Sequence, residues 1–149
     1  MIDVQRPTEG PTLVDLLDRL AVGSVALTER AVAAAGADLT FVQWRVLLVV
    51  GEHQEGVPVG EVAARLGAHA SPASRIVSRL KRRGLLGATR DATDHRVARI
   101  QLTATGSDLR SRILEHRRRG LAAVLAAANL AVGEAAMVAK LARAFEPLT

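Results

Sequence analysis

The chain of 149 residues has no cysteine, no tyrosine, one tryptophan and two phenylalanines. The absence of cysteine excludes disulfides, thiolate metal sites and thiol-based peroxide sensing from this chain. Long apolar runs are absent too, since stretches such as Val46–Val50 fall far short of the roughly 20 residues that a membrane-spanning helix needs. The segment Met1–Gly10 is polar and does not have the apolar core of a secretory signal. We therefore expect a cytoplasmic protein without a membrane partner.

Sequence motifs of enzymes and of metal sites are also missing. There is no glycine-rich phosphate loop, no H-E-x-x-H and no G-x-S-x-G. The histidines are scattered without the spacing of metal ligands, at His53, His69, His95 and His116. We therefore expect no enzymatic activity, no bound metal and no cofactor.

Acidic residues are absent from one stretch, Ser71–Arg90, although the whole chain carries 15 of them. Between His69 and Arg99, eight basic residues stand against two acidic ones, a local charge of +6 in a chain whose formal charge is +5. Basic charge that is concentrated in one stretch is typical of a nucleic-acid-binding surface rather than of a generally basic protein.

The start of this basic stretch has the pattern of a helix. Ser71 is suited to the N-cap, Pro72 to the first helical position and Gly84 to the end. At about 100° per residue, the apolar side holds Ala73, Ile76, Val77 and Leu80. The opposite side holds Ser71, Ser74, Arg75, Ser78, Arg79 and Arg82. The pattern predicts a helix with one face packed on the protein and one face that meets an anion.

The next residues change to the alternation that is typical of strands. Leu85–Arg90 and Val97–Leu102 predict two strands of a hairpin, with the polar segment Asp91–Arg96 as its tip. Asp94 suits the turn because its carboxylate accepts a nearby backbone N–H, and Arg96 then projects beyond the strands. An arginine at the tip of such a β-hairpin wing fits a narrow minor groove, where the negative potential of DNA is enhanced.

These motifs resemble the MarR family of bacterial transcription regulators, which are winged helix-turn-helix homodimers. The family's signature occurs here in one register, as Ser74-Arg75, Leu80, Gly84-Leu85-Leu86, Asp94-His95-Arg96 and Leu102-Thr103-Ala104-Thr105-Gly106. Leu39-Thr40 and Gln43-Trp44 are similar to the family's opening of the second helix. The chain departs from many members at Gly87-Ala88-Thr89, where they carry an acid followed by arginine, and at Arg90, where they have proline.

The resemblance implies a mainly α-helical fold with a small β-hairpin wing, that is, a winged helix-turn-helix with N- and C-terminal dimerisation helices. We expect a single domain over residues 1–149. The dimerisation helices are expected at 12–36 and 104–147, and the winged helix-turn-helix head at 39–103.

Apolar residues at helical spacing predict helices on both sides of the basic stretch. Three such segments follow a threonine, which is a preferred N-cap: Thr12, Thr40 and Thr103. Gln43 stands three residues after Thr40, which is the capping-box pattern of a second, very apolar helix. Gly36 fits the cap at the end of the first helix, and Asn129 with Gly133 marks a break before the last one.

A short helix, Val59–Leu66, and the turn Gly67–Ala70 precede the basic helix, and their lengths are those of a helix-turn-helix. The segment Gly51–Pro58 is expected to be a loop. The long terminal helices have more apolar surface than a small head needs, so a partner chain is expected. The resemblance implies that they interlock in a two-fold homodimer, which would set two basic helices about one DNA turn apart on a pseudo-palindromic operator.

The basic helix and the wing supply the expected contacts to double-stranded DNA. Arg75 is the best candidate for a guanine edge in the major groove, among short side chains at Ser71, Ala73, Ser74 and Ser78. The expected phosphate contacts are His69, Arg79, Arg82, Arg90 and His95. Arg96 is expected to enter the minor groove, while Asp94, Gly84 and Gly106 are expected to be structural.

The family often holds small aromatic or amphipathic effectors between the dimerisation helices and the head. Trp44, Arg45 and His116 are therefore candidate effector contacts, although Trp44 also fits the core and a buried Arg45 would need an acidic ligand or partner. These observations together predict a ligand-responsive transcriptional repressor. The alternative is a winged-helix module that binds a protein partner or coats DNA without sequence preference.

Overall fold

The computed structural model describes residues 11–90, 98–129 and 132–145. In chain order the elements are α1 (Leu13–Ala34), α2 (Phe41–Gly51), β1 (Val57–Pro58), α3 (Val59–Arg65), α4 (Ala70–Arg82), β2 (Leu86–Arg90), β3 (Ala98–Leu102), α5 (Ala104–Ala128) and α6 (Val132–Phe145). The predicted fold class is confirmed, because the chain is mainly helical and carries one small antiparallel sheet.

The sheet has three strands in the order β1-β3-β2, one more than the expected hairpin. In the pairing of β2 with β3, Leu86 lies opposite Leu102 and Arg90 opposite Ala98. The segment Gly51–Pro58, which was expected to be a loop, contains β1, where Val57 pairs with Ile100. A strand of two residues is too short to show an alternating pattern, so only its partner strand reveals it.

The helix caps follow the sequence closely. Thr12 and Thr40 are both N-caps with complete capping boxes, the second one closed by Gln43. Thr103 is the N-cap of α5, and its side chain accepts from the backbone N–H of Gly106. After α1, Gly36 has a φ of +68°, a left-handed conformation that costs glycine little. Local hydrogen bonding by one side chain therefore sets where three of the helices begin.

Two predicted helix boundaries are wrong. α4 begins at Ala70 with His69 as its N-cap, so Ser71 and Pro72 lie inside its first turn. Proline is tolerated there because the first N–H groups of a helix have no acceptor within the helix. The second error concerns the break before the last helix. Asn129 marks this break as predicted, because it is the left-handed C-cap of α5, whereas Gly133 already lies inside α6.

The core is centred on α2, as its apolar composition predicted. The largest completely buried side chains include Trp44 and Leu47 of α2, Leu80 of α4 and Ile113 of α5. They belong to one buried cluster that also includes Leu86 and Ile100 of the sheet. One hydrophobic core therefore holds α4, the sheet and the start of α5 together.

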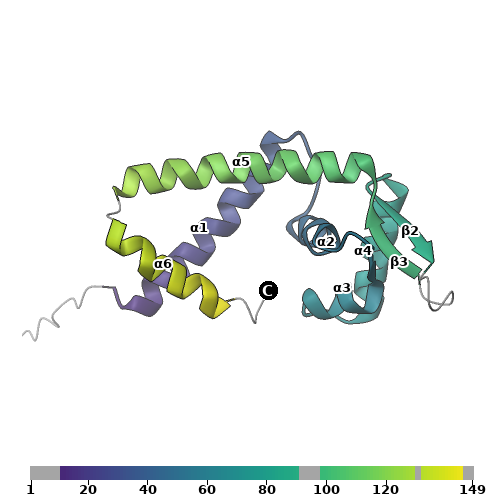
Figure 1. Ribbon diagram of the computed structural model, residues 1–149, viewed down its shortest axis with the longest axis horizontal. Helices are drawn as coiled ribbons and strands as arrows, with labels where there is room; N and C mark the ends of the chain where they lie inside the picture. Colours follow the sequence, from purple (N-terminus) through teal and green to yellow (C-terminus); the bar gives the residue numbers. More distant parts are fainter. Residues whose placement is uncertain (1–10, 91–97, 130–131, 146–149) are drawn as a thin grey trace, which may run out of the picture.

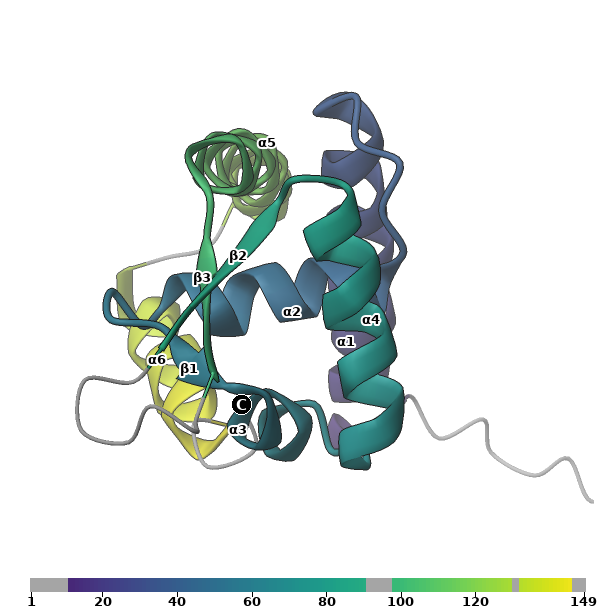
Figure 2. The same cartoon turned by 90° about the vertical axis from the view of Figure 1, so that its right-hand side faces the viewer.

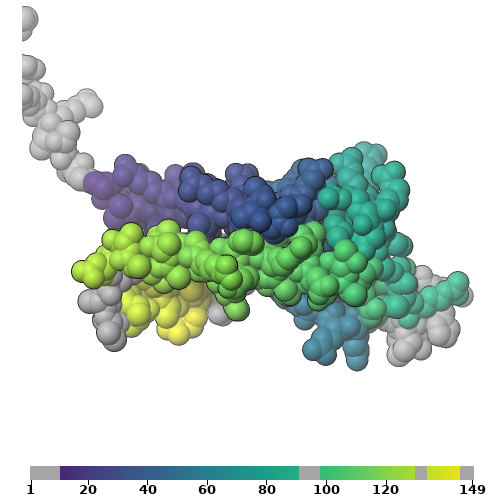
Figure 3. Space-filling model, turned by 90° about the horizontal axis from the view of Figure 1, so that it is seen from above, coloured from purple at the N-terminus to yellow at the C-terminus, as the bar shows by residue number. Residues whose placement is uncertain are grey.

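α5 runs the length of the molecule and separates two functional ends (Figure 1). The head, formed by α2, α3, α4 and the sheet, lies at one end of α5, and α6 lies at the other (Figure 1). In the end-on view, α4 and the sheet lie toward the viewer, on the side of the head opposite to α6 (Figure 2). α1 packs against α5 (Figure 3) but is inclined to it, so that its N-terminal end lies away from α5 (Figure 1).

Candidate nucleic-acid interface

α4 presents two chemically different faces, as its sequence predicted. Val77 and Leu80 are 3% and 0% exposed and pack into the core. The polar side is exposed, and it consists of Ser71, Ser74, Arg75, Ser78, Arg79 and Arg82. His69, at the N-cap, is exposed as well. The exposed face of α4 therefore combines short hydroxyl side chains with long cationic ones.

The structure corrects the expected role of Ala73 in this interface. The sequence placed it both on the apolar side of the helix and among the residues in the major groove, and the structure decides between the two. Ala73 is 0% exposed, one turn before Val77 on the buried side of α4. A side chain that is sealed in the core cannot touch a base edge, so Ala73 is a packing residue.

The cations of the exposed face have no acidic partners. Within the described residues, Arg75, Arg79 and Arg82 make no ion pair and no side-chain hydrogen bond. Surface helices usually mix charges of both signs at i,i+4 spacing, as Glu115 and Arg119 do on α5 at 2.8 Å. Unshared guanidinium groups retain all of their donors for an external anion.

Arg83 differs from the other cations of α4, because it is held by the scaffold. It is the C-cap of the helix, and its Nη1 donates a hydrogen bond to the backbone oxygen of Asp38, in the segment between α1 and α2. A cavity of about 310 Å³ lies beside this hydrogen bond, and we call it the α2–α4 hollow. Its lining residues are Asp38, Thr40, Gln43, Arg79 and Arg83. The sequence had not identified this hollow.

The junction between α4 and the wing is built around Gly84. Its φ of +71° is in the left-handed region, where a side chain would be strained. The N–H of Gly84 donates to Lys81 O at 2.9 Å, and that of Leu85 donates to Leu80 O at 3.0 Å, which closes the end of the helix. These contacts support the expected structural role of Gly84.

Gly106 lies at the closest approach between α5 and the wing. A Cβ at this position would stand 2.0 Å from the backbone oxygen of Leu85. Thr103 reinforces the same contact, because its backbone N–H donates to Leu85 O at 3.2 Å and its hydroxyl donates to Gly84 O at 2.6 Å. Thr103 and Gly106 therefore hold the start of α5 against the backbone oxygens of Gly84 and Leu85, just after the end of α4.

Only part of the wing belongs to the described residues. Arg90 is exposed at the end of β2. Asp94, His95 and Arg96 lie outside the described residues, so their expected positions at the wing tip stay predictions. Arg99, on the neighbouring strand, donates a hydrogen bond to Gly56 O at 2.9 Å, which ties β3 to the turn before β1.

The expected effector contacts do not surround a common cavity. Trp44 is 1% exposed and belongs to the core, so a ligand has no opening to it. Arg45 is half-buried, and its Nη2 donates to the backbone oxygen of Arg65 at 3.1 Å, so one of its donors is used within the head. His116 is half-buried on α5. None of the three lines the cavities described for the chain.

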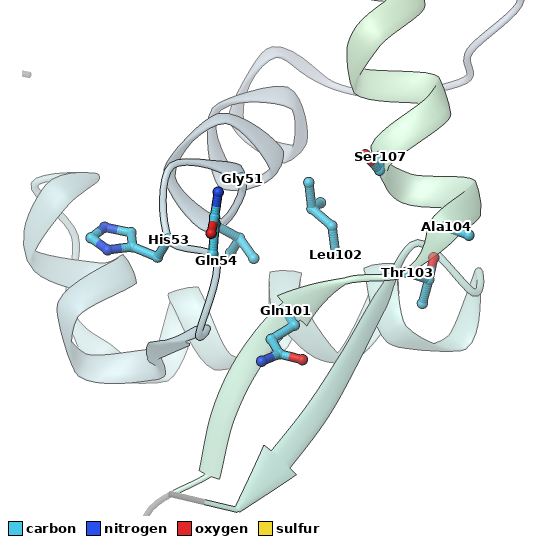
Figure 4. A pocket seen from close by; sticks show the side chains of 9 residues that line it. Gly51, His53, Gln54, Gln101, Leu102, Thr103, Ala104 and Ser107 are labelled. Atoms are coloured by element: carbon cyan, nitrogen blue, oxygen red, sulfur yellow. The ribbon is translucent and has the colours of Figure 1, made fainter.

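Other cavities are found at the junctions of helices. One of about 290 Å³ lies between the end of α2, β3 and the start of α5. Figure 4 shows Gly51, His53 and Gln54 on one side of it, Ser107 of α5 on the other and Leu102 between them. The His53 ring points away from α5, and its Nε2 lies 3.7 Å from Glu61 Oε1. Another cavity, of about 300 Å³, lies between α1 and α5 and is lined by Leu20, Leu27, Leu121 and Val124 with Arg19 and Arg30.

The described residues also bear on metal binding and on membrane insertion. Among the described residues, no group of three or more His, Cys, Asp or Glu side chains is arranged to hold a metal ion. No helix in the described ranges combines the length and the apolar character that a membrane span requires.

Comparisons with known proteins point to one family. The model of the MarR family matches residues 37–97, which include α2, α3, α4 and β2. The PcaV transcriptional regulator from Streptomyces coelicolor is 30% identical, with 96% of this chain and 95% of that chain covered and a TM-score of 0.63. RV1404 from Mycobacterium tuberculosis is 27% identical, with 90% and 92% covered and a TM-score of 0.73.

A MarR family protein from Bacillus stearothermophilus shares the fold, with 24% identity, 91% of each chain covered and a TM-score of 0.76. No curated protein matches in sequence. The match to the family model covers the head, and the likeness to PcaV extends over nearly the whole chain. The chain therefore belongs to the MarR family of winged-helix, DNA-binding transcription regulators.

Proposed function

We propose that the protein is a sequence-specific regulator that binds double-stranded DNA as a homodimer on a pseudo-palindromic operator. The observation that carries the proposal is the exposed face of α4, whose arginines have no acidic partner among the described residues. α4 enters the major groove with Ser71, Ser74, Arg75 and Ser78 toward the bases. His69, Arg79, Arg82, Arg90 and His95 contact phosphate, and Arg96 enters the minor groove.

The terminal helices support the homodimer. Leu13, Leu20 and Val22 of α1 are 71%, 65% and 63% exposed, and Val124 of α5 and Met137 of α6 are 53% and 58% exposed. Exposed apolar residues of this size on the terminal helices are of the kind that protein partners cover. A second copy of the chain would bury this surface and carry a second head at the opposite end of the assembly.

Repression and ligand response complete the proposal. A dimer on an operator that overlaps a promoter would block the polymerase, so repression follows from occupancy alone. The PcaV regulator was solved in complex with its natural ligand, which supports an effector for this chain too. The resemblance to the family implies that this effector is a small aromatic or amphipathic molecule. Such an effector would release DNA by preferring a dimer whose heads are spaced differently.

Competition binding tests the main proposal. Genomic fragments that the protein retains are sequenced, and the enriched duplex is labelled for fluorescence anisotropy. We expect a pseudo-palindromic site that is bound at least about 1,000-fold more tightly than random duplex of equal length. Equal binding of all duplexes would favour a protein that coats DNA. No binding to any duplex would favour a winged-helix module for a protein partner.

A further inference from the structure

The α2–α4 hollow gathers hydrogen-bond donors from two helices. Arg79 and Arg83 stand at i,i+4 on α4, and both line the hollow. Two like charges at this spacing repel each other and destabilise a helix slightly. An anion between the two guanidinium groups would turn that repulsion into attraction.

Gln43 adds a buried donor to this pair. The side chain is 5% exposed, and its Oε1 accepts from the Thr40 backbone N–H at 3.1 Å. Because an N–H can pair only with the oxygen of the amide, Nε2 points away from the cap. No acceptor in the described part of the chain pairs with this Nε2, and the group is not sealed from solvent. Gln43 therefore retains two unused side-chain N–H donors, and it is one of the residues that line the hollow.

The start of α2 strengthens the same preference. α2 has 11 residues, and its N-cap, Thr40, lines the hollow. The N-terminus of a helix carries partial positive charge, which favours an anion. Asp38 is the one acid in the lining, and its carboxylate makes no ion pair with either arginine. The two guanidinium groups therefore leave the lining with a net positive charge.

We propose that the α2–α4 hollow binds one phosphate group, held by Arg79, Arg83, the Gln43 amide and the start of α2. Its source is either a phosphate of the DNA backbone or a free phosphate that competes with DNA for Arg79. The first source rests on the proposed function, whereas the binding of phosphate to the hollow does not. Sequence motifs did not predict this site, because Gln43 and Arg79 are far apart in the chain and only the fold brings them together.

Titration with inorganic phosphate tests the site directly. Potassium phosphate replaces potassium chloride at constant ionic strength, and NMR follows the Gln43 side-chain amide and the arginine Nε–H signals of the full chain. We expect saturable shifts in the wild type and at least about tenfold weaker binding in Gln43→Glu, because a hydrogen bond to a charged group is lost. Gln43→Glu keeps an oxygen that can accept the Thr40 backbone N–H, so the capping box of α2 is retained.

Arg83→Gln provides a second variant in case Gln43→Glu unfolds, and the same tenfold weakening is expected of it. Lys81→Gln is the matched control, because Lys81 is an exposed cation of α4 that does not line the hollow. It should bind phosphate as the wild type does. Shifts that do not saturate, or equal weakening in Lys81→Gln and Arg83→Gln, would overturn the proposal.

DNA binding distinguishes the two sources of phosphate. If the occupant is a backbone phosphate, Arg83→Gln lowers the slope of log affinity against log salt by about 0.9, and added DNA displaces inorganic phosphate. If the occupant is a free anion, the slope is unchanged, and phosphate weakens DNA binding in the wild type but not in Arg83→Gln. A protein that binds no DNA would contradict the proposed function, while the phosphate titration would still decide the site.

Discussion

Arg75 and Arg82 share the exposed face of α4 but differ in their distance from its N-terminus. The N-terminal part of a recognition helix lies deepest in the major groove, where base edges are within reach. Arg75 is therefore assigned to a guanine edge and Arg82 to a phosphate.

This assignment predicts different defects for the two alanine variants. Arg75→Ala should lose about 1–3 kcal/mol of discrimination between operator and random duplex, because bidentate readout of guanine is lost. Arg82→Ala should weaken all duplexes alike and lower the salt slope by about 0.9. Anisotropy titrations at several salt concentrations measure both quantities. Arg118→Ala, at an exposed position on α5, is the control. Equal losses on specific and random DNA in both variants would contradict the assignment.

Gly106 shows how one missing side chain determines a tertiary contact. Because its Cβ would stand 2.0 Å from Leu85 O, Gly106→Ala must push α5 away from the wing. We expect the free energy of unfolding to fall by about 3 kcal/mol, which is typical of severe overpacking. Urea denaturation measures it. Gly60→Ala in α3, where a Cβ would meet nothing within 4 Å, should change stability by less than about 1 kcal/mol. Similar losses in both variants would refute the role of the close contact.

At the scale of elements, one hydroxyl connects α4 to α5. Thr103 Oγ1 donates to Gly84 O at 2.6 Å and accepts from Gly106 N at 3.0 Å. Thr103→Val retains the shape of the side chain but removes both bonds, and we expect a loss of about 1–2 kcal/mol in the free energy of unfolding. Thr103→Ser retains the hydroxyl and should stay within about 0.5 kcal/mol of the wild type. Thermal and urea unfolding measure both variants. If Thr103→Ser lost as much free energy of unfolding as Thr103→Val, the hydroxyl would not be what connects the two helices.

The start of α1 predicts a dependence on pH. Hydrogen bonds from the Thr12 side chain and backbone hold the pKa of Asp15 below its usual range. A carboxyl whose pKa is lower in the folded state stabilises the fold above its unfolded pKa, and this contribution is lost as the pH falls through the folded pKa. The first turn of α1 should therefore loosen in acid. Thr12→Val should raise the Asp15 pKa measured by NMR, whereas Thr12→Ser should not. Identical titrations of the two variants would argue against the capping box.

At the scale of the whole molecule, exposed apolar residues on α1, α5 and α6 lie away from the head (Figure 1). Their position separates the surface that we propose for a second chain from the surface that we propose for DNA. A homodimer that is formed through these helices leaves both copies of α4 exposed.

Charge placed on this surface should therefore dissociate the dimer without unfolding the head. We expect Leu20→Glu to sediment as a monomer and to lose tight binding to a pseudo-palindromic duplex, because a carboxylate would be buried at the interface. Val42→Glu is the matched control for the oligomeric state alone, since Val42 is 44% exposed on α2 in the head and not on a terminal helix. Analytical ultracentrifugation measures the oligomeric state of both variants, and fluorescence anisotropy measures the binding of Leu20→Glu to the duplex. A dimer that persists in Leu20→Glu would place the interface elsewhere.

The predictions that succeeded depend on neighbouring residues. Thr12, Thr40 and Thr103 cap helices through bonds to residues three positions away, and Val77 and Leu80 are buried because of their spacing on one helix. The predictions that failed needed knowledge of distant residues. β1 exists only because Val57 pairs with Ile100, and Ala73 was expected both on the apolar side of α4 and in the major groove until the core enclosed it.

The sequence by itself therefore determined the family signature, the helix caps and the two faces of α4, because hydrogen bonds and helical periodicity act over a few residues. Tertiary structure alone decided that Val57 pairs with Ile100 and that Gly106 touches Leu85. It alone also placed Gln43 beside Arg79 and Arg83 around one hollow. These contacts join residues whose separation in the chain carries no periodic signal, so only the packing of the helices against one core brings them together.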